Sequence, residues 1–330
     1  MTIKQIADSL GVSTATVSNV IHGHLEKMSP ETAQNIREQL EKYQYIPNMG
    51  ARMLAKGDSE IVGVITNYPN REEKLALQDP FVSEMLGALE NAIRANGYFT
   101  MACGSLSGYS GAGLYQQFLE RFGDHPYVVL QEKVNDEFGN RTSIVIENYQ
   151  SYYQCVQHIV VDHGYRRIAY VSGPAGHPDA RERLRAFEDV MAKYHVPVSE
   201  KDIVYGDFSE YVDMLVERLL AERPDLQAII FANDEMAKAG YRVCEKLGLV
   251  VGRDIAITGF DNLRSALQME PPLSTVWQDT YRMGTLAIES IMALLAGKHA
   301  ECDSYRYAGH REEHRGRASG KTAGIPVYRH

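Results

Sequence analysis

The chain has 330 residues, of which 44% are hydrophobic, and a formal net charge of −9 at pH 7. This length predicts two or three compact units, and the acidic balance argues against a protein that coats nucleic acid over its whole surface. The first 20 residues are polar and no later stretch reaches the roughly 18 apolar residues of a membrane span, so we expect neither a signal peptide nor a membrane anchor.

The cysteines indicate the cellular compartment, and the distribution of charge indicates how the chain is divided. Four cysteines stand far apart without a C-x-x-C pair, which predicts neither a disulfide framework nor a zinc site and favours the reducing cytoplasm. Residues 1–57 carry six Lys/Arg and five Asp/Glu, a net charge of +1, which leaves −10 for the rest. A small, nearly neutral headpiece is therefore expected on an acidic body.

The beginning of the chain predicts two short helices joined by a turn. Over Thr2–Leu10 the apolar residues recur at i, i+3, i+4 and i+7, and Gly11 ends the pattern. Ser13 can cap a second helix, whose apolar side chains again share one face. The residues expected on this buried face are Val17, Val20 and Ile21.

The outer face of the second helix carries small or hydrogen-bonding side chains. In a DNA major groove, Asn can read adenine, Ser and Thr can bond a base or a phosphate, and an Ala or Thr methyl can touch thymine. The candidate DNA-contacting residues of this helix are Thr14, Ala15, Thr16, Ser18, Asn19 and His22.

A third helix is predicted from the cap Ser29 and from Pro30 at the first helical position. It is expected to close a minimal all-α core with inward side chains at Ala33, Ile36, Leu40 and Tyr43. The same spacing also suits a three-helix bundle that does not bind DNA, and the spacing alone leaves that alternative open.

The runs IKQIADSLGVSTATVSNVI and MSPETAQNIREQLEKYQYIPNMGARMLAKG resemble the headpiece of the LacI/GalR repressors over nearly every position from 2 to 57. The resemblance implies a sequence-specific transcription regulator, a repressor that binds a near-palindromic operator as a homodimer. It departs from the family at Asn19, where arginine is usual, and at His22, where asparagine is usual. We therefore expect an unusual operator sequence.

The segment after Pro47 is expected to act as a hinge. It is short, with glycine inside and at its end, so alone it would hardly stay helical. By the resemblance it orders on operator DNA, with Asn48 and Leu54 as DNA contacts and Leu54 inserted between base pairs in the minor groove. The alternative is a plain linker.

From Ile61 onward, short apolar runs alternate with helical patterns. The expected strands include IVGVIT, YFTMAC, IAYVSG, AIIFAN and DIAITGF. This alternation predicts parallel sheets with crossover helices, in which ligands bind beyond the carboxyl ends of the strands.

The segments GPAGHPDARERLRAF, FANDEMAKAGYRVCEKLGLVVGRDIAITGFDN and PPLSTVWQDTYRMG resemble the effector domain of the same family. The resemblance implies a two-lobed α/β body of the periplasmic-binding-protein-like type I fold that binds a small effector, a sugar or alternatively a purine-like ligand. It implies hydrogen bonds to the effector from Arg183, Asn233 and Asp261 and an aromatic contact from Phe81. Trp277 and Gln131 are further candidates.

Each candidate also has a structural alternative. Asn233 can serve only as a helix cap and Asp261 can shape a turn, while Arg183 can lie on a solvated face. Trp277 can be a core residue and Gln131 an ordinary loop residue.

No catalytic constellation emerges, so we expect no enzymatic activity and no cofactor. His310 and His314 suggest a metal by spacing, but they lie in a polar, Gly-rich stretch that is expected to be solvated and unstructured. A periplasmic solute-binding protein would share the body but should lack the headpiece.

The predicted organisation has four parts: a helix-turn-helix headpiece at 1–46, a hinge at 47–58, an effector-binding and dimerisation domain at 59–300, and a disordered tail at 301–330. About twenty residues are missing between YFTMAC and PYVVLQ by comparison with the family pattern, and the tail lacks the usual closing strand. These departures keep open an altered family member that retains only ligand binding or folds poorly.

Overall fold

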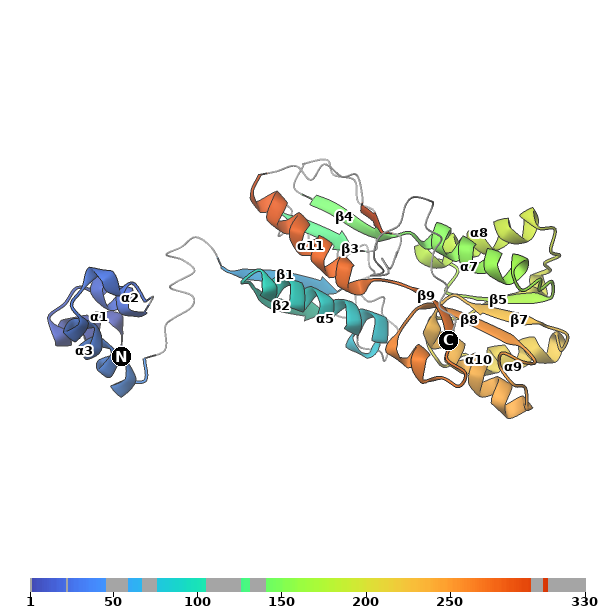
Figure 1. Ribbon diagram of the computed structural model, residues 1–330, viewed down its shortest axis with the longest axis horizontal. Helices are drawn as coiled ribbons and strands as arrows, with labels where there is room; N and C mark the ends of the chain where they lie inside the picture. The colour runs from blue at the N-terminus through green and yellow to red at the C-terminus, as the bar shows by residue number, and fades with distance from the viewer. Residues whose placement is uncertain are drawn as a thin grey trace, which may run out of the picture. The chain divides into compact units, whose positions relative to one another are not determined.

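The computed structural model describes residues 2–21, 23–45, 59–66, 76–104, 126–130, 141–297 and 305–307. The chain divides into two compact units, Met1–Ile61 and Val62–His330 (Figure 1). None of the helices within these described ranges is long and apolar enough to cross a membrane.

Within residues 2–21 and 23–45, the N-terminal unit forms a bundle of three α-helices, α1 (Ile3–Leu10), α2 (Thr14–Ile21) and α3 (Pro30–Lys42), with the 3-10 turn η1 (Leu25–Lys27) before α3. A reciprocal capping box between Thr2 and Gln5 begins α1, and the Ser29 hydroxyl accepts from the Thr32 N–H to begin α3. The helices enclose a small apolar core. Its buried residues are Ile6, Ala7, Val17, Val20, Ala33 and Ile36.

Tyr43 corrects the sequence expectation for α3, because its side chain is 41% exposed rather than turned inward. The helix ends at Lys42, and Tyr43 caps it with φ −98° and ψ 7°, so the helical spacing no longer applies to it. Its ring faces the Lys42 ammonium at 5.3 Å, and Tyr45 packs against the core instead.

The second unit has two lobes. The second lobe holds a five-stranded parallel sheet in the order β6-β5-β7-β8-β9. Its strands are β5 (Ile168–Ser172), β6 (Ile203–Tyr205), β7 (Ala228–Phe231), β8 (Ala256–Asp261) and β9 (Ser274–Trp277). Helices α7 (Asn148–Val161) and α8 (Pro178–Lys193) cover one face, and α9 (Asp213–Glu222) and α10 (Asp234–Leu247) the other (Figure 1). The short turns are η3 (Glu200–Asp202) and η4 (Arg264–Gln268).

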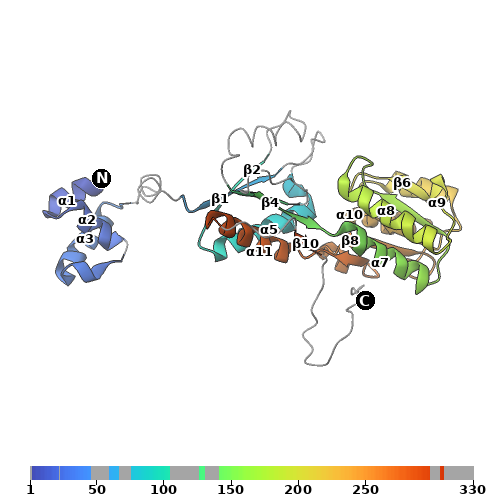
Figure 2. The same cartoon turned by 90° about the horizontal axis from the view of Figure 1, so that it is seen from above.

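The first lobe contains the pair β1-β2 and the parallel set β10-β4-β3. Its strands are β1 (Ile61–Thr66), β2 (Phe99–Gly104), β3 (Tyr127–Leu130), β4 (Arg141–Ile146) and β10 (Tyr305–Tyr307). Its helices are η2 (Ala76–Gln78), α5 (Pro80–Ala95) and α11 (Thr280–Leu295). Figure 2 shows α5 and α11 side by side.

Helix α11 reaches the first lobe after the second-lobe strand β9, and Gly284 lets it approach α5 closely. A Cβ atom at Gly284 would lie 2.8 Å from the backbone carbonyl of Ala88 and 3.0 Å from the Leu89 nitrogen. This contact between backbones ties the chain segment that follows the second lobe to the first lobe.

Strand β10 corrects the expectation that residues 301–330 form an unstructured tail throughout. Tyr305–Tyr307 pair in parallel with Ile144, Val145 and Ile146 of β4. Tyrosine favours strands, and pairing satisfies backbone groups of β4 that an edge would leave open. The polar, Gly-rich composition of residues 301–330 gave no sign of this three-residue strand. The segment 105–125, where the family pattern predicts missing residues, lies outside the described residues.

Candidate functional site

Helix α2 presents the polar face that the sequence predicts. Thr14 and Ala15 are exposed, Ser18 and Asn19 are half-buried, and Val17 is fully buried on the opposite side. The Ser13 hydroxyl caps the helix by accepting from the Thr16 N–H at 3.0 Å and also lies 2.8 Å from the Thr16 hydroxyl. His22, Asn48 and Leu54 lie outside the described residues.

Arg183, on α8, is buried in the second lobe with only 4% of its side chain exposed. Its Nε donates to Asn148 Oδ1 at 2.8 Å, and its Nη1 donates to the Ala232 carbonyl at 2.5 Å. The Cζ atom lies 3.9 Å from the centroid of the Phe260 ring. These contacts exclude a solvated face for Arg183 and fix its guanidinium at the carboxyl ends of β7 and β8.

Asn233 follows β7 and is the N-cap of α10. Its Oδ1 accepts from the Met236 N–H at 3.0 Å, and its Nδ2 donates to the Phe208 carbonyl at 2.9 Å. Asn233 therefore has a structural role, and it stands next to Ala232, whose carbonyl binds Arg183.

Asp261 ends β8 in a conformation with φ +120°, which L-residues rarely adopt. Burial raises the pKa of this carboxyl well above its usual value, against the opposing effect of the Arg183 charge. Gln278 Nε2 donates to Asp261 Oδ1. The structure thus brings Arg183, Asn233 and Asp261 together at one edge of the sheet.

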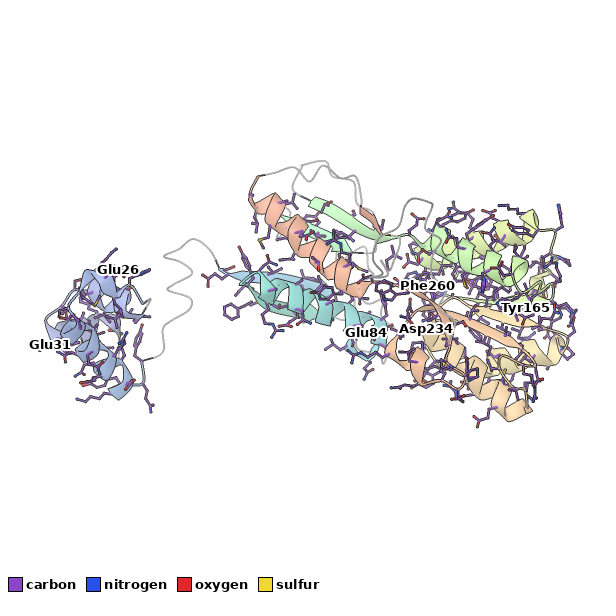
Figure 3. The ribbon with its side chains drawn as sticks, in the orientation of Figure 1. Glu26, Glu31, Glu84, Tyr165, Asp234 and Phe260 are labelled. Atoms are coloured by element: carbon purple, nitrogen blue, oxygen red, sulfur yellow. The ribbon has the colours of Figure 1, made fainter. Side chains whose placement is uncertain are left out.

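A second buried acid, Asp234, holds the loop that follows Asp261. Its Oδ2 accepts from the Leu263 N–H at 2.8 Å, and its Oδ1 accepts from the Thr275 hydroxyl at 2.5 Å. Burial raises its pKa to about 7. A Cβ atom at Gly259 would lie 2.2 Å from Asp234 Oδ1, so glycine leaves the room that this carboxylate occupies. Figure 3 shows Asp234 near Phe260.

The two aromatic candidates, Phe81 and Trp277, lie in different surroundings. Phe81 is half-buried and packs on the first-lobe core. Asp79, which caps the same helix, contributes a negative charge that further raises the pKa of Asp261. Trp277 is half-buried and lines a small pocket. The other lining residues are Ile146, Ser151, Phe260, Gln278, Asp279 and Met283.

The pocket residues come from both lobes and from the connection between β9 and α11, where Gln278 also reaches Asp261. The backbone N–H of Arg264 donates to Glu84 Oε1 at 3.5 Å, and Figure 3 shows Glu84 at the end of α5 that faces the second lobe. Gln131 lies outside the described residues.

Sequence reasoning missed several residues of this site. Asn148 links Arg183 to the Asp179 carboxylate, to which its Nδ2 donates at 2.9 Å. Asn148 and Gln278 both follow apolar strands, so the rule that selected Asn233 would have found them. Phe208 had no such signal. Its ring lies where a Cβ at Gly173 would be only 2.2 Å away, a contact that only the fold creates.

His177 is a further residue at this edge. Its ring packs edge-to-face on Phe208 at 5.1 Å, and burial lowers its pKa.

Two family models match the chain. "Bacterial regulatory proteins, lacI family" matches residues 2–48, and "Periplasmic binding protein-like domain" matches residues 156–307. The HTH-type transcriptional regulator CelR of Thermobifida fusca is 27% identical and is matched over 91% of this chain and 93% of its own. The HTH-type transcriptional repressor PurR of Proteus mirabilis is 25% identical, over 92% and 93%.

Solved structures share the fold. The lac repressor dimer bound to operator and the anti-inducer ONPF has a TM-score of 0.76 at 24% identity, covering 93% of this chain and 96% of that one. A complex of the transcriptional regulator CelR with cellobiose has a TM-score of 0.60 at 23% identity, over 90% and 94%.

The first of the two family-model matches lies in the N-terminal unit of the chain and the second lies in the C-terminal unit. The chain belongs to the lacI family of bacterial regulatory proteins, which are DNA-binding transcriptional regulators and not enzymes.

Proposed function

We propose that this chain is a cytoplasmic repressor that binds a near-palindromic operator as a homodimer, and that a sugar bound in its body controls its affinity for DNA. The observation that carries the effector part is the buried cluster of Arg183 with Asn148, the Ala232 carbonyl and the Phe260 ring.

The DNA part rests on the exposed and half-buried polar face of α2. Small side chains there allow the helix to approach the major groove, where Asn19 is the candidate for adenine readout. We assign the remaining base and backbone contacts to Thr14, Ala15, Thr16, Ser18 and His22, and those of the hinge to Asn48 and Leu54. Two headpieces on a two-fold axis would read two half-sites, which is why we propose a homodimer.

The effector part rests on preorganised polar groups. Among the described residues, Arg183 Nη2 has no hydrogen-bond partner, whereas its Nε and Nη1 are already bound. Together with Asp261, and with the second N–H of the Asn233 amide nitrogen, whose first N–H donates to the Phe208 carbonyl, it offers donors and acceptors suited to vicinal hydroxyl groups, which both donate and accept. Phe81 and Trp277 add aromatic surface on which the apolar face of a sugar ring packs.

These polar and aromatic side chains favour a sugar over a purine as the effector. One matched structure is a complex of the transcriptional regulator CelR with cellobiose, whereas several relatives are named HTH-type transcriptional repressor PurR. The chemistry of Arg183 and Asp261 supports hydroxyl recognition, and Gln131 is a further proposed contact. Binding of a purine is the alternative that the test below can detect.

Control of DNA binding would follow from linkage. An effector that binds one arrangement of the two lobes better than the other shifts their equilibrium, and the paired headpieces then fit the operator better or worse. A change in the arrangement of the two lobes would alter two features: the contact of Glu84 with the backbone N–H of Arg264, and the pocket at the connection of β9 and α11.

Selection of random duplex DNA by the purified protein tests the DNA part. Enrichment of a pseudo-palindrome is expected, and its affinity should be measured at fixed salt, since salt alone changes binding strongly. A folded dimer that enriches no sequence would refute operator recognition and favour the altered family member, which retains ligand binding only.

Trp277 provides the test of the effector part, because it is the single tryptophan of the chain and lines the pocket. Its fluorescence is titrated with a panel of mono- and disaccharides and with purine bases. Saturable change with a sugar, coupled to a shift in operator affinity, is expected. A response to purines alone would overturn the sugar assignment.

A further inference from the structure

The last turn of α7 and the turn that follows it each carry a histidine, and the two rings face one another. His158 Nε2 and His163 Nε2 lie 3.1 Å apart, with ring centroids separated by 4.7 Å and ring planes at 83°. The helix ends at Val161, and Gly164 adopts the left-handed conformation with φ +68°. Because this turn also brings the His163 N–H to the His158 carbonyl at 3.3 Å, the backbone itself places the two rings together.

The spacing of the two nitrogens suits shared coordination of one ion. Two imidazole nitrogens at 2.0–2.1 Å from a zinc ion, at right or tetrahedral angles, are separated by about 2.8 to 3.4 Å. Without an ion, nitrogens this close share a single proton in an N–H···N hydrogen bond. An ion would replace that proton, since both nitrogens must be unprotonated to coordinate.

We propose that His158 and His163 form a binding site for a divalent transition-metal ion, with zinc as the representative. Asp162 supports this assignment, because its carboxylate pairs with His158 Nδ1. Such a carboxylate–histidine pair is the usual outer partner of a metal ligand, as it keeps the proton on Nδ1 and leaves Nε2 to coordinate. The partial negative charge at the C-terminus of α7 also favours a cation.

The surroundings hold the second ring in place. Tyr165 stacks on His163 with centroids 5.5 Å apart and an interplanar angle of 19°. Arg166 donates to the Val160 and Tyr165 carbonyls nearby. Its positive charge repels a metal ion and so lowers the affinity of the site for zinc. No group of three or more His, Cys, Asp or Glu able to hold a metal occurs in the described ranges. Two protein ligands are therefore expected, with water completing the coordination.

The site is separate from the proposed effector site. His158 and His163 precede β5, whereas Arg183 and Asp261 meet at the carboxyl ends of β7 and β8. Figure 3 shows Tyr165 at the end of the second lobe that lies away from Phe260. Metal binding would thus stabilise the second lobe without occupying the effector pocket.

Zinc titration by calorimetry tests the proposal on the full chain carrying His310→Gln and His314→Gln, which removes the paired histidines of the tail. One equivalent of zinc is expected to bind this parent and to raise its melting temperature. Adding His163→Asn should abolish both effects, and adding Asp162→Asn should weaken binding by about 10- to 100-fold. His195→Asn, at an exposed histidine after α8, is the matched control and should change neither.

His163 is exposed, so its replacement leaves the core intact. The proposal is overturned if the parent binds no zinc, or if the His163→Asn variant binds zinc with the affinity and stoichiometry of the parent.

Discussion

The guanidinium of Arg183 is held against the ring of Phe260, with Cζ 3.9 Å from the ring centroid. The ring, the Asn148 amide and the Ala232 carbonyl together restrict the side chain to one position. A planar group fixed in this way loses little further freedom on binding, so preorganisation strengthens its hydrogen bonds to a ligand.

Arg183→Lys tests this arrangement. Lysine keeps the charge but cannot bind Asn148 and Ala232 while also reaching a ligand, so the proposed sugar should lose one charged hydrogen bond. Such a bond contributes about 1.5–3 kcal/mol, which corresponds to about a 10- to 150-fold weaker affinity. Trp277 fluorescence measures the effector affinity, and operator binding without effector should be unchanged.

Arg185→Lys is the matched control, because Arg185 lies on the exposed side of the same helix, beside Glu182 and the Tyr149 ring. An effector affinity equal to that of the parent protein in the Arg183→Lys variant would exclude Arg183 from the binding site.

Gly284→Ala should destabilise the protein by about 1–3 kcal/mol, because the added methyl group meets the backbone of α5. Gly87→Ala, within α5, is the control: a Cβ there meets nothing within 4 Å, so the change should stabilise the helix by about 0.5–1 kcal/mol. Urea unfolding measures both. Equal effects of the two substitutions would contradict a close contact between α5 and α11.

The headpiece was predictable from sequence because its signals are local. Ser29 caps α3, Gly11 ends α1 in the left-handed conformation, and Val17 and Val20 fall on one face by spacing alone. The prediction that Tyr43 points inward was wrong for a local reason as well, because the apolar spacing continues past Lys42, where the helix ends. Secondary structure can be read where a cap, a glycine and a period agree.

The effector site was predictable only in part, because its residues meet through the fold. The rule that polar residues follow parallel strands pointed to Asn233 and Asp261. It could not reveal that the Asn233 amide accepts from the Met236 N–H and donates to the Phe208 carbonyl, or that Asp234 is buried. The burial of Arg183 depends on Asn148, which stands 35 residues earlier, so no local pattern could place it.

The buried carboxyl of Asp234 predicts a pH-dependent stability. Its pKa is raised to about 7 by burial, so between about pH 4 and pH 7 the folded protein holds a proton that the unfolded chain has released. Its contribution to the free energy of unfolding is therefore greatest below about pH 4 and falls as the pH rises from about 4 to 7. Its size is on the order of a few kcal/mol.

Asp234→Asn removes the titrating group while keeping its shape. The stability of the parent relative to this variant should decline as the pH rises from 4 to 7, measured by urea unfolding at each pH. The difference is the useful quantity, because other acids contribute to both proteins alike. A difference that stays constant over this range would show that Asp234 is ionised throughout.

Leu54→Ala tests the proposed hinge, which lies outside the described residues. If Leu54 inserts between base pairs, its loss should weaken binding to the selected operator far more than binding to random DNA, because only the operator complex contains the deformed step. Lys56→Ala is the comparison, since a lysine that meets only phosphate should weaken both kinds of DNA similarly and reduce the salt dependence. Titrations of both variants on both DNAs at several salt concentrations separate the two roles. Equal losses on operator and random DNA for Leu54→Ala would assign Leu54 to a plain linker.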